Sequence, residues 1–254
     1  MTRMRQAERQ LKLQELFTTE EFASFDDLCE RFRASKSSIR RDLIELEVRG
    51  VLRRVHGGAI SLQVRDETLD FERLSVSRHD EKTRIGKAAA SLVKDGQTVI
   101  LGGGSTVAEV ARNLSSRHIQ IVTNSIPVAQ IFWDSKQAEV TLTGGYLYPR
   151  LGVQLGPICE RMLNSVSADL LIMGIGGITA TGISDSNSLI VESIRAMIRA
   201  VRRVVIVADR SKFGYDSMIQ VATLDDVDQI VSDEGLDPEY RQMLKENQVD
   251  CILA

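Results

Sequence analysis

Apolar residues recur at helical spacing near the N-terminus. Ile39, Leu43 and Leu46 lie three or four positions apart and mark one face of a helix. Ser35 precedes this run as the expected N-cap, and Gly50 follows it as the expected stop. At about 100° per residue, the opposite face of this helix carries Ser37, Arg41, Ile44, Glu45 and Val48.

The neighbouring segments predict a complete motif around this helix. A polar and apolar pattern indicates a helix over Arg5–Phe17 and a short second helix over Phe25–Phe32. Residues 33–35 then turn into the helix already described, which gives a helix-turn-helix. Val51–Ile60 is too short and too rich in glycine for another helix, and we expect a β-hairpin wing there.

Positive charge is concentrated on this motif. Residues 31–60 hold eight Lys or Arg against three acids, whereas the whole chain has a net charge of −3. A local basic patch on an acidic protein favours a polyanion bound at one place, although charged outer helix faces are more often simply solvated. Hydroxyls can face any base edge, guanidinium can bind guanine, and wing cations can reach phosphate. The expected DNA contacts are Ser35, Lys36, Ser37, Ser38, Arg40, Arg41, Arg53, Arg54 and His56.

After a polar, aperiodic segment the pattern changes to short apolar runs that alternate with helical ones. We expect a DNA-binding domain over 1–60, a linker over 61–77 and an α/β domain over 78–254. The predicted strands are Thr98–Leu101, Gln120–Thr123, Glu139–Thr143, Leu170–Met173, Val204–Ala208 and Gln229–Ser232. The predicted helices are Lys82–Val93, Ser105–Leu114, Pro127–Trp133, Gly156–Val166, Val191–Val201 and Pro238–Asn247. This alternation predicts a mainly parallel sheet covered on both faces.

The loops that follow these strands are rich in glycine and polar residues. The C-terminal ends of parallel strands line a ligand crevice, and a helix N-terminus offers N–H groups to an anion. The loop GGGST runs straight into a helix, which indicates a phosphate cradle. The expected effector contacts are Gly103, Gly104, Ser105, Thr106, Asn124, Ser125, Gly144, Gly145 and Lys212. Each loop alone is as well explained by a tight turn, and Lys212 alone by a solvated lysine.

Composition excludes several classes of protein. The N-terminal residues MTRMRQAERQ lack the apolar segment of a secretory signal, and no apolar run approaches the roughly 20 residues of a membrane span. The cysteines at 29, 159 and 251 and the three histidines are scattered, so we expect a cytoplasmic protein without a metal site or cofactor.

Both halves of the chain resemble the DeoR family of bacterial transcriptional regulators. Residues 35–59 match S-x-x-S-I-R-R-D-L-x-x-L-E-x-x-G-x-L-x-R-x-H-G-G-A, with Ser38 where the family usually has Thr. Glu81-Lys82, Asp95-Gly96, GGGSTV, TNS, TGG, ADLLIMGIGG, AMIRAV and VADRSKFG follow in the order of the family's sensor domain. Gly102 and Ser105 replace the usual Asp and first Thr of the first loop.

The resemblance implies the fold and the function. The family's sensor domain is similar in fold to ribose-phosphate isomerases, and the family implies a repressor of a carbohydrate-utilisation operon that senses a phosphorylated sugar. A single helix-turn-helix covers half of an operator site, so we expect a homodimer or homotetramer on double-stranded DNA.

The main alternative is a sugar-phosphate isomerase with an appended DNA-binding domain. That reaction needs a placed carboxylate base, and the strand Leu170–Met173 is followed by Gly174-Ile175-Gly176-Gly177. Asp185 and Glu192 are the acids nearby, so we favour binding without turnover. A constitutive nucleoid protein would not need the large second domain.

Overall fold

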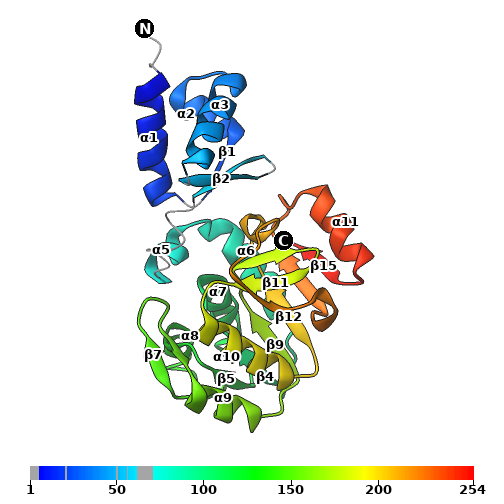
Figure 1. Ribbon diagram of the computed structural model, residues 1–254. Helices are drawn as coiled ribbons and strands as arrows, with labels where there is room; N and C mark the ends of the chain where they lie inside the picture. Colours follow the sequence, from blue (N-terminus) through cyan, green and yellow to red (C-terminus); the bar gives the residue numbers. More distant parts are fainter. Residues whose placement is uncertain (1–5, 21, 50, 56, 62–70) are drawn as a thin grey trace. The chain divides into compact units, whose positions relative to one another are not determined.

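The computed structural model describes residues 6–20, 22–49, 51–55, 57–61 and 71–254. The chain forms two compact units, 1–69 and 70–254, which are considered separately. In the N-terminal unit the elements are α1 (Gln6–Thr19), β1 (Phe22–Ser24), α2 (Phe25–Phe32), α3 (Lys36–Val48), β2 (Leu52–Val55) and β3 (Gly58–Ser61) (Figure 1).

The predicted helix-turn-helix and wing are present in this unit. Ser35 has extended backbone angles and its hydroxyl accepts the Ser38 N–H, so it caps α3 as expected. The predicted Gly50 stop lies outside the described residues. Strands β2 and β3 form the antiparallel hairpin, and β1, which we did not predict, pairs with β3. Leu13, Phe17, Leu28, Ile39 and Leu43 join the three helices in one core.

The C-terminal unit is built on a parallel sheet of seven strands in the order β15-β14-β12-β9-β4-β5-β6. Its strands are β4 (Thr98–Leu101), β5 (Gln120–Thr123), β6 (Glu139–Leu142), β9 (Leu170–Met173), β12 (Val204–Val207), β14 (Gln229–Ser232) and β15 (Asp250–Leu253). Its longer helices are α6 (His79–Ala90), α7 (Ser105–Leu114), α8 (Ile126–Ile131), α9 (Pro157–Asn164), α10 (Ser188–Arg199) and α11 (Pro238–Glu246).

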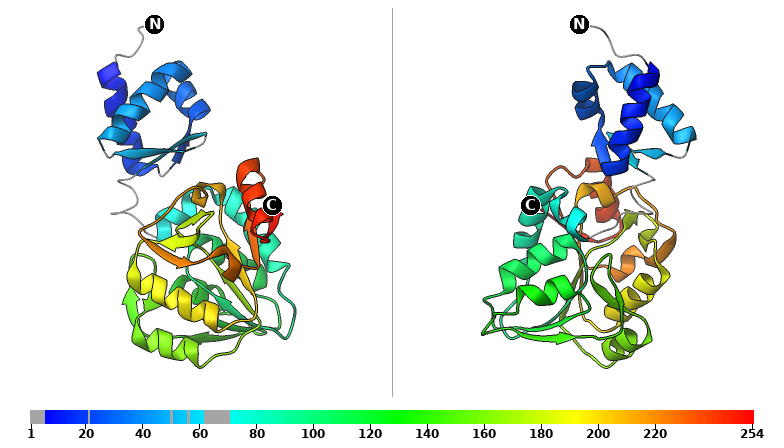
Figure 2. Two further views of the ribbon diagram at one scale, coloured as in Figure 1. Left: turned by 45° about the vertical axis from the view of Figure 1, so that its right-hand side comes forward. Right: turned by 90° about the vertical axis from the view of Figure 1, so that its left-hand side faces the viewer.

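Alternate strand residues enter two separate cores. Val99 and Leu101 pack with α6, α7 and α8, whereas Ile100 packs with residues of α9 and α10 on the opposite face. The two views in Figure 2 show helices on both sides of this sheet. The prediction of a parallel sheet covered on both faces is confirmed.

Several short elements were not predicted from the sequence. Helix α5 (Phe71–Val76) occupies part of the segment expected to be a linker over 61–77, and residues 62–70 lie outside the described part. The sheet gains β15 at its edge. The hairpin of β7 (Tyr146–Tyr148) and β8 (Val153–Leu155) and the small sheet of β10 (Gly177–Thr179), β11 (Gly182–Asp185) and β13 (Ile219–Ala222) are also additions. These strands have three or four residues each, too few to show a period.

Candidate functional site

Helix α3 presents the face that the helical angles predicted. Ser37, Arg41 and Glu45 are exposed, and the apolar side chains of Ile44 and Val48 are 39% and 84% exposed. Exposed apolar groups on a recognition surface can contact thymine methyl groups. The buried stripe of Ile39, Leu43 and Leu46 holds the other side of α3 against α1 and α2.

The first turn of α3 is organised by its own side chains. The Ser35 hydroxyl lies 3.0 Å from the Ser37 hydroxyl and 2.9 Å from the Ser38 hydroxyl. The Lys36 ammonium pairs with Asp26 at 2.6 Å on an exposed surface, and the Arg40 guanidinium lies over the Phe25 ring, 5.8 Å from its centroid. Contacts to α2 therefore fix the flanking cations, while Arg41 has a long 3.4 Å contact from its Nε to the Ser37 carbonyl.

The wing arginines are also placed by neighbours. The Arg54 backbone N–H and its Nε donate to the two oxygens of Glu47, at 2.8 and 2.7 Å. Burial alone would raise the pKa of Glu47, but the bonds from Arg54 lower it below its ordinary value. Arg53 is half-buried, and His56 lies outside the described residues. The DNA contacts of these side chains stay predictions.

A buried polar network, which we did not predict, joins α1 to α3. The Arg9 Nε donates to the Asp42 carboxylate at 2.6 Å, and both residues are buried. The Gln10 amide nitrogen lies 3.3 Å from Asp42 and 2.6 Å from Glu45, and Gln6 donates to Glu45 at 3.1 Å. The signal in the sequence was Asp42, a carboxylate that falls on the apolar face of the helix.

We expect Arg41→Ala to weaken binding to the operator by about 1–3 kcal/mol and to relax preference at one base position. The reason is that Arg41 projects from the exposed face of α3.

Arg54→Ala should weaken binding to all sequences alike and reduce the log–log salt slope by roughly one. Titration of operator and random duplexes at several salt concentrations measures both effects. An equal loss for the two duplexes in Arg41→Ala would refute its base-reading role.

The second candidate site lies at the C-terminal ends of the parallel strands. Successive strands run outwards from β4 to β6, and the chain then returns to place β9 on the other side of β4. This reversal between β4 and β9 is a topological switch point, where ligands bind in open parallel sheets. The loop after β4 leads into α7, and the next strand but one, β12, ends roughly 10 Å away.

The first turn of α7 is the feature of this crevice best suited to an anion. Gly104, at the N-cap, has φ of +119°, offers no capping side chain and has open space where a Cβ would point. As the first two residues of α7, Ser105 and Thr106 have backbone N–H groups without an intrahelical acceptor. Gly103 and Gly145 have packing roles, because a Cβ there would lie 2.5 Å from a Val153 methyl and 2.6 Å from the Leu155 carbonyl oxygen.

Gln154 on β8 connects the loops after β5 and β6, and we did not predict its role. Its N–H donates to the Asn124 carbonyl at 2.7 Å, and its own carbonyl accepts from the Asn124 amide at 3.0 Å. Its Oε1 accepts the Gly144 N–H at 3.0 Å. The Asn124 Oδ1 is buried without a partner among the described residues. Ser125 is fully buried, and its hydroxyl caps α8 by accepting the Val128 N–H at 3.3 Å.

Lys212 lies on the 3₁₀ turn η1 (Arg210–Lys212) that follows β12. Burial would raise the pKa of Asp209, but Lys212 and Arg78 lower it below its ordinary value. Burial raises the pKa of Asp185, against the opposing effect of nearby backbone N–H groups and Lys212. The half-buried Lys212 therefore lies within electrostatic range of two carboxylates and is more than a solvated lysine.

Family comparisons match both units of the chain. The DeoR C terminal sensor domain matches residues 77–234, and the DeoR-like helix-turn-helix domain matches residues 9–65. The chain belongs to the DeoR family. As a DeoR-family member it is a DNA-binding transcriptional regulator, and its C-terminal unit holds the family's sensor domain.

Relatives match this DeoR regulator along almost its whole length. The uncharacterized HTH-type transcriptional regulator YulB of Bacillus subtilis is 31% identical over 244 residues, covering 96% of this chain and 95% of the relative. The HTH-type transcriptional repressor GlcR of the same organism is 29% identical, with coverage of 99% and 97%. The transcriptional repressor AccR of Agrobacterium fabrum is 34% identical, with coverage of 90% for each.

A comparison with solved structures gives partial alignments. Ribose 5-phosphate isomerase A of Methanocaldococcus jannaschii aligns with 54% of this chain and 55% of its own, at 18% identity and a TM-score of 0.40. Within the part of the chain that the structure describes, no cluster of His, Cys, Asp and Glu could hold a metal ion. No helix among those residues is both long and apolar enough to cross a membrane.

Proposed function

We propose that this DeoR regulator is a cytoplasmic repressor of a carbohydrate-utilisation operon and that a phosphorylated sugar releases it from its operator. Two of its relatives are named repressors. The uncapped first turn of α7 carries the effector proposal, because it combines unpaired N–H groups, two hydroxyls and open space above Gly104. Lys212 would add a charge-assisted hydrogen bond from the end of β12.

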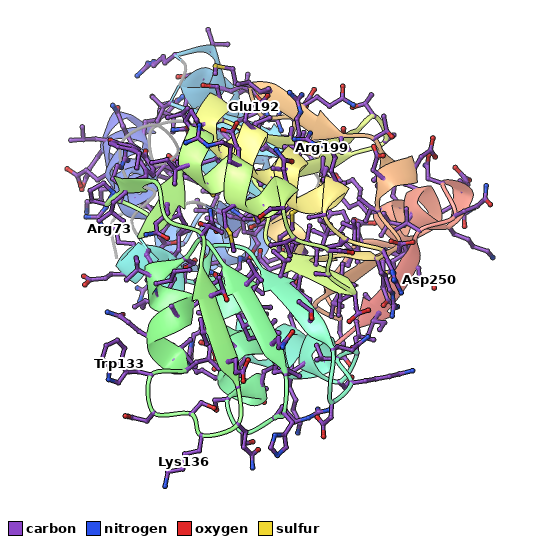
Figure 3. All side chains as sticks on the ribbon, turned by 90° about the horizontal axis from the view of Figure 1, so that it is seen from below. Arg73, Trp133, Lys136, Glu192, Arg199 and Asp250 are labelled. Carbon is purple, nitrogen blue, oxygen red and sulfur yellow. The ribbon has the colours of Figure 1, made fainter. Side chains whose placement is uncertain are left out.

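Binding without turnover is part of the proposal. The strand β9 is followed by glycines rather than by a placed base, and Glu192 on α10 pairs with Arg195 at 2.7 Å on the surface (Figure 3). One observation favours the isomerase alternative. The pKa of the Asp185 carboxyl is raised by burial, within electrostatic range of Lys212, and a carboxylate base is what an isomerase needs. The Asp185 carboxylate is held by the N–H groups of Ser186 and Asn187, at 2.7 and 3.4 Å. An isomerase assay with ribose 5-phosphate tests that alternative.

A thermal-shift screen of the full chain against sugar phosphates and the matching unphosphorylated sugars tests the effector. A ligand that binds only the folded state stabilises it by mass action, by about 2.7 kcal/mol at a ligand concentration a hundred times Kd. The melting temperature rises as a result. Each hit is then added to the operator complex. Release of DNA supports the proposed repressor, whereas tighter DNA binding would reverse the direction of the response.

An apolar surface beside the sheet edge supports a dimer or tetramer. The edge strand β6 is largely exposed, and Leu142, Tyr146 and Ile158 are 42%, 61% and 56% exposed. A Cβ on Gly144 would lie 3.6 Å from an Ile158 methyl, so Ile158 lies beside the loop that joins β6 to β7. Trp133, 85% exposed, projects outwards after α8 (Figure 3). Parallel strands are normally covered on both faces, and a second copy of the chain would cover this apolar surface.

We expect Tyr146→Asp, on β7 of this surface, to weaken association at least tenfold, because it places a charge in an apolar contact. Sedimentation of the full chain over a concentration series measures the effect. Met218→Asp is the control, since Met218 is 76% exposed outside this surface. An unchanged assembly in Tyr146→Asp would place the interface elsewhere, and a monomeric natural chain would refute the oligomer itself.

A further inference from the structure

The beginning of α6 carries buried charges that the proposed effector contacts do not use. Lys82 is 5% exposed and Asp209 is 3% exposed. Arg78 joins this cluster, with its Nε 3.6 Å from the Asp209 carboxylate and its guanidinium 3.8 Å from Glu81. Buried charges are costly unless they are paired and hydrogen-bonded, so this cluster marks a place where position matters.

Lys82 connects the cluster to α5. Its ammonium donates to the backbone carbonyl of Leu74, within α5. The other end of α5 is held by the Phe71 N–H, which donates to the Arg150 carbonyl at 2.9 Å. In chain order α5 is the first described element of the sensor after the DNA-binding unit. A change at Lys82 therefore acts on the segment through which the two units are connected covalently.

Asp209 connects the same cluster to Lys212. Its carboxylate caps η1 by accepting the Ser211 N–H at 3.0 Å, and its carbonyl accepts the Lys212 N–H at 3.0 Å. The Arg78 Nε lies 3.6 Å from the Asp209 carboxylate, and the Arg78 carbonyl accepts the Lys82 N–H at 3.1 Å. Lys212, Arg78 and Lys82 all lower the pKa of Asp209, against the effect of burial. The chain of groups thus runs from the effector crevice to α5.

We propose that Asp209 and Lys82 are positioning residues that transmit effector binding at Lys212 to helix α5. A phosphate dianion near Lys212 competes with Asp209 for that cation. Asp209 then draws Lys82 and Arg78 more strongly, and the bond from Lys82 to Leu74 weakens. Effector and operator affinities change by the same factor through this coupling. The inference rests on the proposed effector site but makes a separate prediction about α5.

Hydrogen exchange of the full chain tests this coupling with inorganic phosphate as the probe and chloride at equal ionic strength as the control. The peptides to follow are the start of α7 and residues 71–77, where the Ser77 N–H donates to Arg73 at 3.1 Å. The variants are Lys82→Met, which keeps the apolar stem, and Lys82→Arg, which keeps the charge. Lys87→Met is the matched control, because Lys87 is exposed on the same helix.

In the natural chain, phosphate should slow exchange at the start of α7 and speed it in α5 by about tenfold, the effect of losing one charge-assisted hydrogen bond. In Lys82→Met, α5 should exchange faster without phosphate and gain no further increase with it, while α7 is still protected. Lys82→Arg should restore part of the response, and Asp209→Asn should protect α7 without changing α5.

The outcomes separate the two proposals. Protection of α7 with no change of α5 in the natural chain would overturn the coupling and leave the phosphate site intact. No protection of α7 would overturn the phosphate site and, with it, the effector end of the coupling. A phosphate response of α5 that persists in Lys82→Met, or an equal effect of Lys87→Met, would overturn the role of Lys82.

Discussion

Replacing Asp42 by alanine is expected to destabilise the DNA-binding unit by about 3–5 kcal/mol, because it removes one partner of a buried ion pair. The Asp42 side chain is only 1% exposed, and the side chain of Arg9, whose Nε donates to it, is 9% exposed. Hydrogen exchange of α3 in the full chain measures the loss, which corresponds to roughly 150–5,000-fold faster exchange.

Asp26→Asn is the matched control for this prediction. Asp26 pairs with Lys36 at the same 2.6 Å distance, but both side chains are more than 70% exposed. An exposed pair contributes about 0–1 kcal/mol, so α3 should exchange almost normally. Equal effects of the two substitutions would show that burial does not determine the strength of the link between α1 and α3.

Lys212→Ala is expected to weaken effector binding by about 1.5–3 kcal/mol, roughly 10–150-fold, while operator binding without effector stays nearly intact. The loss follows from removal of the Lys212 ammonium, which lies on the turn that follows β12. Thr106→Ala should be milder, about 1 kcal/mol, since one hydroxyl among several donors is lost. Calorimetry with the sugar phosphate found by the screen measures both values.

The exposed Lys94 provides a control for Lys212, because Lys94→Ala removes the same charge at a site away from the crevice. The unphosphorylated sugar provides the control for the ligand. Equal affinity for the sugar and its phosphate would contradict the phosphate-cradle interpretation. So would an unchanged response in Lys212→Ala.

The sequence predicted those helices and strands that show a periodic apolar stripe or a continuous apolar run. Helix α3 was recognised from its apolar stripe, and the strands β4, β5, β9 and β14 were located from compact apolar runs. Strand β15, with one exposed and three partly buried residues, follows α11 closely and has no such signal. Helix α5 consists of six polar and apolar residues without a buried face, so its pattern could not distinguish it from a linker.

The sequence likewise predicted some features of the candidate sites and missed others. The exposed residues of α3 follow from helix geometry, and the loops after the strands follow from the parallel sheet. The bonds from Gln154 to the Asn124 and Gly144 loops depend on a short hairpin that folds back from a distant part of the chain. The link from Arg9 to Asp42 joins residues 33 positions apart, so the place of Asp42 on the apolar face signals a buried partner but does not identify Arg9 as that partner.

Helices α6 and α7 pack closely at Gly86. A Cβ on this buried glycine would lie 2.6 Å from the Glu109 Cβ and 2.7 Å from its carbonyl carbon, so glycine is what allows this contact. Gly86 is one helical turn beyond Lys82, and Glu109 is one turn beyond Ser105. We therefore expect a shift of the first turn of α7 to displace α6, and Lys82 with it, because no side chain at Gly86 separates the two helices.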